Sequence, residues 1–374
     1  MLASKLAPEI VNNLRSNIAR AFLALFFSAL IVASEARTQD YAETLLTTDN
    51  AYNPIPSPDG KYIAYVRTGW GEKLWIGFGR ASLVSDVKIV TVKGDAAPRT
   101  LATDYFLSAW TPDSTRVVCY RDWNYALVST EGKRTMTGRI PNDPDRFDIA
   151  AEWVAYSSSL ETIIWSRQVD KSHRAIETPT RTIVKDGMFW QERVIPSPDG
   201  RYLAVFREES QTDLRVYDLL LKSWTDLGRM SIHPDKNWWY IQPNWNPWFT
   251  DSSRLVFLRD STLVITSPDG TQNTETKVDG HTGLPVASPD GQSIAYVTFE
   301  PRPMKERPDL QFWGGTTIWV IPASAGSTPR PITQKNEDEV YDLKWLSNDT
   351  LVFDRVADEE FYGHARIWKA AVPR

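Results

Sequence analysis

The stretch IPSPDGRYLAVF, from Ile195 to Phe206, contains the sequence unit that decides the fold. Its Ser-Pro-Asp-Gly tetrapeptide also precedes two other short β-rich segments, at Ser57–Gly60 and Ser288–Gly291. Proline presets φ early in the turn, aspartate accepts hydrogen bonds from nearby backbone N–H groups, and glycine tolerates positive φ. The same turn repeated before similar strands predicts one small β unit that is copied several times.

Four further segments match this unit in a weaker form, with an aromatic residue near a polar turn and an apolar strand after it. They begin at Trp110, Trp153, Trp248 and Trp345. A fourth Ser-Pro-Asp-Gly, Ser267–Gly270, follows an apolar run, and we assign it to the turn between the third and fourth strands of a unit. Seven units between Asp40 and Arg374 average roughly 48 residues, near the size of a four-stranded propeller blade. We therefore predict an all-β propeller with seven four-stranded blades, six being the alternative number.

The two ends of the repeat region predict how the ring closes. Glu43–Thr48 has the threonine-rich form of an outer strand, but it precedes the first unit. The last unit reaches Ala365–Trp368 and then ends at Arg374 without such a strand. We expect the N-terminal strand to complete the last blade, because closure removes the exposed strand edges that promote aggregation. Deletion of Tyr41–Thr48 is then expected to destabilise the fold severely.

The turn, the aromatic or apolar residue before it and the alternating strand after it resemble the TolB-like (WD40-like, PD40 repeat) β-propeller family. The resemblance covers roughly Ala42 to the C-terminus. It is to the propeller portion only, without the N-terminal α/β domain of TolB. The resemblance implies a propeller fold for residues 37–374 and leaves the function open.

The first 36 residues do not belong to the repeat. A leader containing Lys5, Arg15 and Arg20 is followed by the apolar run Ala21–Ala33, and small residues follow at Ser34 and Ala36. The run is shorter than the ~20 residues of a membrane-spanning helix, and its flanks favour a cleaved secretory signal over residues 1–36. We expect a periplasmic or secreted protein. The alternative is an uncleaved anchor facing the periplasm, with membrane contact only through residues 21–33.

Composition argues against several classes of function. The net charge of −5 gives no support to nucleic-acid binding, which usually needs a basic face. Four scattered histidines and the single Cys119 argue against a zinc site, and we expect neither a metal nor a cofactor. Cys119 lies in an apolar segment and is expected to be buried in a strand. The nucleophile elbow, the zinc-protease motif and the phosphate-binding glycine loop are absent from the sequence, so we nominate no catalytic residue and favour a non-enzymatic protein.

Acidic residues recur in the turns and resemble a set of functional carboxylates. Because they occupy one repeat position, we interpret them as turn formers spread around the ring. They are Asp59, Asp113, Asp199, Asp251 and Asp290.

Aromatic residues outside the repeat pattern are the candidate binding residues. The densest stretch is Lys236–Trp248, in which Trp248 matches the repeat and is assigned to the core. The candidates are Trp238, Trp239, Tyr240 and Trp245 in that stretch, Trp70 and Trp75 in an insertion over Gly69–Asp86, and Trp313 after a Pro-rich segment over Glu300–Asp309, which we expect to be an exposed loop. Exposed aromatic residues supply large contact areas for protein or sugar recognition. The alternative is that they pack between neighbouring blades.

These observations favour an exported protein-interaction scaffold, or a complex subunit, that binds an envelope or membrane-complex protein through loop aromatics. The alternative function is an enzyme or ligand-binding protein that acts on a carbohydrate or lactone in the central channel. That function requires acids, histidines or a metal to converge at the inner ends of the strands.

Overall fold

The computed structural model describes residues 42–68, 85–121, 124–141, 154–168, 174–186, 192–207, 211–231, 245–283, 285–303, 311–336, 338–356 and 365–373. The chain divides into two compact units, 1–41 and Ala42–Arg374, and all described residues lie in the second. The expected signal segment therefore lies outside the described residues. Within them, no helix has the length and apolar character needed to cross a membrane.

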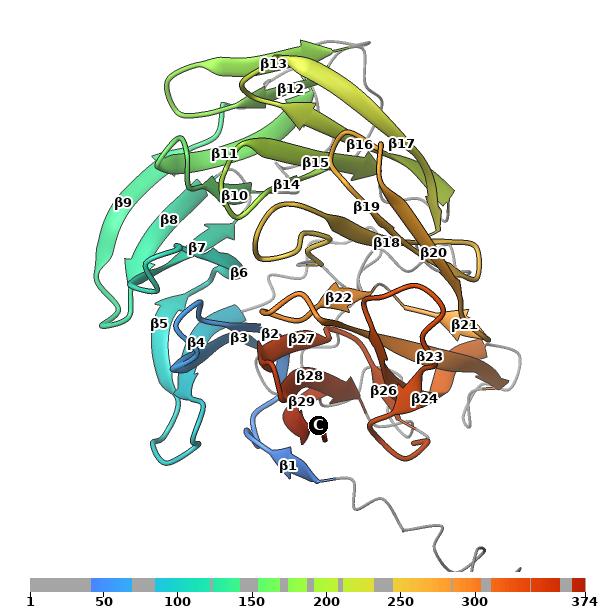
Figure 1. Ribbon diagram of the computed structural model, residues 1–374. Helices are drawn as coiled ribbons and strands as arrows, with labels where there is room; N and C mark the ends of the chain where they lie inside the picture. Colours follow the sequence, from blue (N-terminus) through green and yellow to red (C-terminus); the bar gives the residue numbers. More distant parts are fainter. Residues whose placement is uncertain are drawn as a thin grey trace, which may run out of the picture. The chain divides into compact units, whose positions relative to one another are not determined.

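The described residues form seven antiparallel sheets, one for each predicted blade (Figure 1). In blades 1 to 4, four consecutive strands pair in chain order. Blade 1 contains β2 (Ala51–Pro56), β3 (Tyr62–Thr68), β4 (Ser85–Thr91) and β5 (Arg99–Thr103); blade 2 contains β6 (Phe106–Trp110), β7 (Arg116–Arg121), β8 (Asn124–Ser129) and β9 (Arg134–Arg139); blade 3 contains β10 (Val154–Ser157), β11 (Thr162–Gln168), β12 (Arg174–Glu177) and β13 (Thr182–Asp186); blade 4 contains β14 (Glu192–Pro196), β15 (Tyr202–Arg207), β16 (Gln211–Asp218) and β17 (Ser223–Ser231).

Blades 5 to 7 keep the same order but have an irregular innermost strand. In blade 5 an isolated bridge between Trp248 and Leu255 takes its place. In blades 6 and 7 it is split into two short pieces that pair with the same second strand. Blade 5 contains β18 (Leu255–Arg259), β19 (Thr262–Thr266) and β20 (Asn273–Lys277); blade 6 contains β21 (His281–Thr282), β22 (Val286–Ala287), β23 (Ser293–Pro303), β24 (Gln311–Pro322) and β25 (Arg330–Pro331); blade 7 contains β26 (Glu339–Val340), β27 (Lys344–Ser347), β28 (Thr350–Val356) and β29 (Ala365–Ala371).

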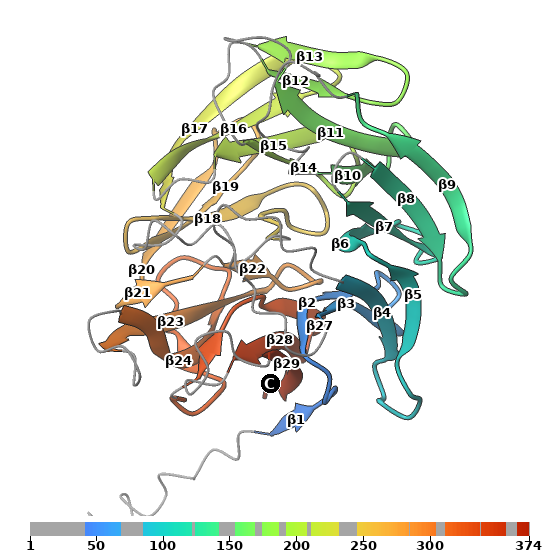
Figure 2. The same ribbon diagram turned by 180° about the vertical axis from the view of Figure 1, so that it is seen from behind.

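The ring closes as the sequence predicts. Strand β1 (Glu43–Leu45) pairs antiparallel with β29 and supplies the outer strand of blade 7, while β2 goes on to begin blade 1 (Figures 1 and 2). An ion pair supports this junction, since Arg355 Nη1 on β28 lies 2.8 Å from Glu43 Oε2. The first and last segments of the described chain are therefore held in one blade.

The Ser-Pro-Asp-Gly turns form as expected between the first and second strands of blades 1, 4 and 6. In blade 1, Asp59 Oδ1 accepts hydrogen bonds from Ser57 Oγ (2.7 Å) and from the Lys61 N–H (3.1 Å), and Gly60 adopts a φ of 69°. The turn at Ser267–Gly270 joins β19 to β20, which confirms its assignment between the third and fourth strands. The repeated aspartates are thus turn formers.

Two recurring hydrogen bonds tie neighbouring blades together. Between blades 1 and 2, Trp110 Nε1 donates to the Ile55 carbonyl (2.8 Å), and the Asp59 N–H donates to Ser114 Oγ (2.9 Å). The same two bonds recur between blades 4 and 5 and between blades 6 and 7, where they use Trp248 with Ser252 and Trp345 with Asn348. A complete tetrapeptide in one blade is thus followed by a tryptophan and a polar turn residue in the next.

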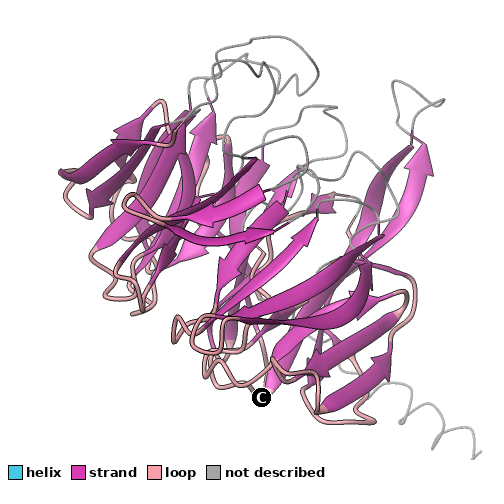
Figure 3. Cartoon of the chain, turned by 90° about the horizontal axis from the view of Figure 1, so that it is seen from above, coloured by secondary structure: helices cyan, strands magenta, loops and turns pink. Residues whose placement is uncertain are grey.

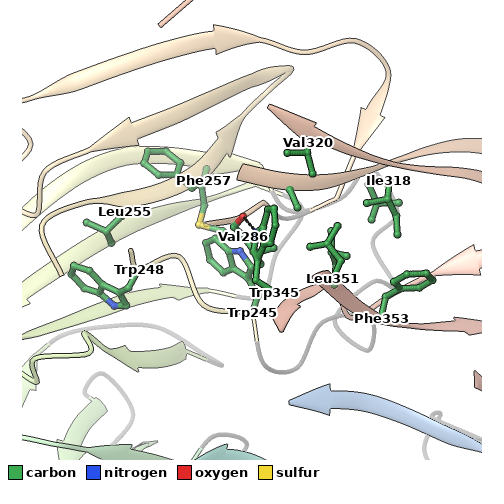
Figure 4. Packing of buried hydrophobic residues seen from close by; sticks show 14 of the residues in the cluster. Trp245, Trp248, Leu255, Phe257, Val286, Ile318, Val320, Trp345, Leu351 and Phe353 are labelled. Carbon is green, nitrogen blue, oxygen red and sulfur yellow. Dashed lines mark hydrogen bonds between the residues drawn. The ribbon is translucent and has the colours of Figure 1, made fainter. Parts of the chain in front are cut away.

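The largest hydrophobic cluster extends through blades 4, 5, 6 and 7 (Figure 4). Trp248, Phe257 and Phe353 are buried in it, and the figure shows the bond from Trp345 to Val286. Cys119 on β7 is completely buried, as expected, and burial raises the pKa of its thiol to about 12.

The structure corrects one prediction about a loop. Glu300–Asp309 was expected to be irregular, but Glu300–Pro303 is the last part of β23 and pairs with Gln311–Gly314 of β24. Prolines are tolerated here because, of the described strands, β24 alone pairs with this segment, so the missing N–H groups can face away from the ladder.

Candidate functional site

The propeller has two faces with different kinds of connection. Because successive strands are antiparallel, the first-to-second and third-to-fourth turns of every blade lie on one face, which we call the short-turn face. Bonds between the turns of neighbouring blades, such as Ser159 Oγ to the Gly200 carbonyl (2.6 Å), place these turns side by side. Figure 3 shows the short turns along one side. The second-to-third connections and the connections between blades lie on the other, the long-connection face.

In the sequence, most candidate aromatics fall between strands whose ends lie at the long-connection face. Trp70 and Trp75 lie between β3 and β4, and Trp238, Trp239 and Tyr240 lie between β17 and β18. These five residues lie outside the described residues. Trp313 is in β24, where its backbone pairs with Pro301 near the end of the β23–β24 hairpin on the same face. The chain topology therefore brings to one face the strand ends that flank these segments.

Trp245 does not share this environment. It is 1% exposed, its ring packs edge-on against Phe206 with centroids 5.2 Å apart, and its Nε1 donates to the Pro285 carbonyl (2.7 Å). Both the ring and the N–H group are used inside the protein. The alternative of packing between blades therefore describes Trp245, and we remove it from the candidate binding residues.

A group of buried charged residues surrounds Asp354, which is 1% exposed on β28. Asp354 Oδ2 accepts the Asn53 N–H (3.0 Å), and Oδ1 accepts the Asp342 N–H (2.7 Å). Asn53 has a φ of 58°, so its N–H lies in a left-handed bend of β2. Burial raises the pKa of Asp354 to about 6, and the two backbone donors oppose that increase. This carboxyl group thus fastens blade 7 to the innermost strand of blade 1.

Asp342, Lys344 and Arg193 complete this group, which we call the channel cluster together with Asp354. Asp342 is 2% exposed, and its Oδ1 accepts no hydrogen bond from a described residue, although Lys344 Nζ lies 3.7 Å away. Burial raises the pKa of Asp342, and the positive charges of Lys344 and Arg193 oppose that rise. Burial likewise lowers the pKa of Lys344. Arg193 belongs to β14 of blade 4, so two acids and two bases from different sides of the ring interact.

The channel cluster was missed at the level of sequence because its members are far apart in the chain. One signal was available. Asn53 and Arg193 each stand four residues before the serine of a Ser-Pro-Asp-Gly turn, in a segment expected to be a buried inner strand. A polar residue at such a position indicates a polar partner from another blade. Among the described residues, His, Cys, Asp and Glu side chains form no group of three or more that could hold a metal ion.

Comparison with known proteins shows which solved structures share this fold. No family model and no curated protein sequence matches the chain. The β-propeller domain of Myceliophteria thermophila Cps50 (Swd1) is similar in structure, with a TM-score of 0.56 and 11% identity over 89% of this chain and 100% of that domain. The fold is that of a WD40-like β-propeller. The C-terminal WD40 domain of Sif2 is also similar, with a TM-score of 0.50 and 12% identity over 89% of this chain and 99% of the other. At these identities the likeness concerns the fold alone.

Proposed function

We propose that the protein is an exported, non-enzymatic scaffold or complex subunit that binds a protein partner of the cell envelope through its long-connection face. The observation that carries this proposal is the shared position of the strand ends that flank Trp70, Trp75, Trp238 and Trp239. Aromatic residues gathered on one face are typical of protein-binding surfaces. A closed ring with ties between its blades keeps that face rigid, which limits the entropy lost on association.

The proposal includes a place for the chain among the TolB-like propellers and export to the envelope. The recurrence of complete Ser-Pro-Asp-Gly turns at one position in blades 1, 4 and 6 supports the first part. The basic leader and the apolar run Ala21–Ala33 support the second. N-terminal sequencing of the mature protein tests export: a start near Arg37 supports a cleaved signal, and an intact N-terminus supports the anchor instead.

Affinity purification tests the binding function. The tagged full chain is isolated from gently solubilised native envelopes, and bound proteins are identified and quantified by mass spectrometry. We expect a stoichiometric partner whose recovery decreases about tenfold or more in Trp238→Ala and Trp239→Ala, as for residues at the centre of an interface. The matched control is Leu220→Ala/Leu221→Ala, because these leucines are 73% and 67% exposed at a turn of the short-turn face. A chain that binds no protein in stoichiometric amount, or equal losses in both sets of variants, would contradict the proposal.

The channel cluster favours a second candidate function, the binding of a small molecule in the central channel. Two acids of blade 7 support this alternative: Asp342 lies between the two pieces of the innermost strand, and Asp354 lies on the second strand, β28. Asp342 Oδ1 is a buried acceptor without a hydrogen-bond donor among the described residues. A neutral, hydroxyl-bearing ligand is compatible with the balanced charges of the cluster. Titration calorimetry with D-glucose and N-acetylglucosamine, in wild type and Asp342→Asn, tests this function. No heat of binding with either sugar would exclude these two as ligands of the cluster.

A further inference from the structure

Blade 6 carries a two-stranded ribbon that extends beyond its neighbouring strands. Pairing of β23 with β24 continues from Glu300–Gly314 to Pro303–Gln311. On one side, β21 pairs with β23 no further than Phe299. On the other side, the described partners of β24 end where Asn336 bridges Thr316. Beyond these points, no other described strand continues the ladder on either side of the ribbon.

The two edges of the ribbon differ in chemistry. In an antiparallel pair, residues that bond each other directly exchange two N–H to carbonyl bonds. Proline has no N–H, so Pro301 and Pro303 must occupy the positions that do not bond across the ribbon. Their partners, Trp313 and Gln311, occupy the same kind of position. The N–H and carbonyl groups of Trp313 and Gln311 therefore point outward from the ribbon.

This arrangement leaves one edge able to pair and one edge blocked. The β23 edge lacks N–H donors at Pro301 and Pro303 and cannot complete a ladder. The β24 edge offers alternating donors and acceptors at Gln311 and Trp313. Two ion pairs hold the base of the ribbon, since Glu300 contacts Lys335 Nζ at 2.6 Å and Arg302 Nη2 at 3.6 Å.

We propose that the outer edge of β24, from Gln311 to Trp313, accepts an extended segment of the protein partner as an additional strand. The inference rests on the proposed function, because this edge lies on the long-connection face. Addition of a strand to an open edge gives affinity through main-chain hydrogen bonds. Two outward residues bury too little surface to hold two copies of this chain together. A partner already bound to the same face can supply the extra strand at small additional entropic cost.

Proline substitution tests the edge directly. Trp313→Pro and Gln311→Pro each remove one outward N–H group and leave the bonds between β23 and β24 in place. We expect each to reduce recovery of the partner by about tenfold, the effect of losing one interfacial hydrogen bond. Gln311→Ala is the matched control, because it removes the side-chain amide but keeps the N–H group, and its recovery of the partner is expected to equal that of wild type. Pro301→Ala, on the blocked edge, is expected to leave recovery unchanged. Equal urea midpoints show that all variants fold.

Hydrogen exchange in the purified complex gives an independent measurement. Amide exchange at Gln311 and Trp313 is expected to slow on addition of the partner, whereas exchange at the β23 edge stays the same. Should wild type bind no protein, both the proposed function and this inference fail. Should it bind a stoichiometric partner that the proline variants bind equally well, the proposed function stands and the inference is overturned. Protection of these amides in a dimer of the isolated chain would assign the edge to a second copy and likewise overturn the inference.

Discussion

Neutralising Glu43 tests how the ring is closed. Glu43 on β1 pairs with Arg355 Nη1 at 2.8 Å, and the Arg355 side chain is only 5% exposed. The Arg355 guanidinium also lies 5.2 Å from the ring centroid of Phe353 and 5.1 Å from that of Trp368. Glu43→Gln keeps the size of the side chain but leaves a buried cation without its counter-charge.

Removal of one partner of a buried ion pair lowers the free energy of unfolding by about 3–5 kcal/mol. Because the two aromatic rings still stabilise the cation, each by about 0.5–1 kcal/mol, we expect a loss near the lower limit, about 3 kcal/mol. The Glu43 side chain is 19% exposed, so solvent screens the pair only in part. Deletion of Tyr41–Thr48 removes the backbone bonds of β1 as well, among them the bond from the Leu46 N–H to the Ile367 carbonyl (2.8 Å). The deletion is therefore expected to be more destabilising than the substitution.

Equilibrium unfolding in urea, followed by tryptophan fluorescence at pH 7, measures both effects. A decrease in the midpoint with an unchanged slope identifies a change in stability. Glu275→Gln is the matched control, since Glu275 pairs with Arg259 at 3.2 Å but both side chains are more than a third exposed. Glu275→Gln should lower the free energy of unfolding by less than about 1 kcal/mol. If Glu43→Gln lowers the free energy of unfolding no more than Glu275→Gln does, the ion pair does not support closure of the ring and the reasoning is wrong.

Three further predictions concern the ties between blades and the channel cluster. Trp110→Phe keeps most of the buried ring but leaves the Ile55 carbonyl without its donor, so urea unfolding should show a loss of about 1–2 kcal/mol; a loss near zero would mean that this bond contributes nothing. Ser114→Gly relieves a φ of 60° but removes the acceptor of the Asp59 N–H, so thermal melting should place it between wild type and the less stable Ser114→Ala. Burial raises the pKa of Asp354 above its unfolded value, so the contribution of this carboxyl group to stability is complete below pH 3.8 and is lost as the pH rises through about 6. Urea unfolding midpoints measured between pH 4 and 7.5 should therefore decrease more in wild type than in Asp354→Asn. Parallel curves for the two proteins would refute this linkage.

The local sequence was sufficient to predict those features that depend on hydrogen bonds between residues close together in the chain. The Ser-Pro-Asp-Gly turns depend on bonds between residues within five positions of each other, as between Ser57 and Tyr62. Their positions therefore predicted the turns, the blade order and the seven blades. The missing last strand predicted closure by β1. The charged, Pro-rich composition of Glu300–Asp309 was misleading, because the continuation of β23 depends on its pairing with β24 and not on its own residues.

Tertiary structure alone decided the relations between blades. Arg193 and Asp342 are far apart in the chain. The position of Arg193 before its turn indicates a polar partner in another blade, but only the tertiary structure identifies Asp342 as one whose charge it affects. Ser114 adopts a left-handed φ at the place of a glycine, and its hydroxyl accepts a bond from the turn of the preceding blade. Trp245 matches an exposed aromatic loop in sequence but is buried in the core. The sequence by itself thus determined which segments become turns and strands, since turn chemistry and alternation act over a few residues. Contacts between blades form only when the ring closes. These contacts decide which polar and aromatic side chains are buried or paired.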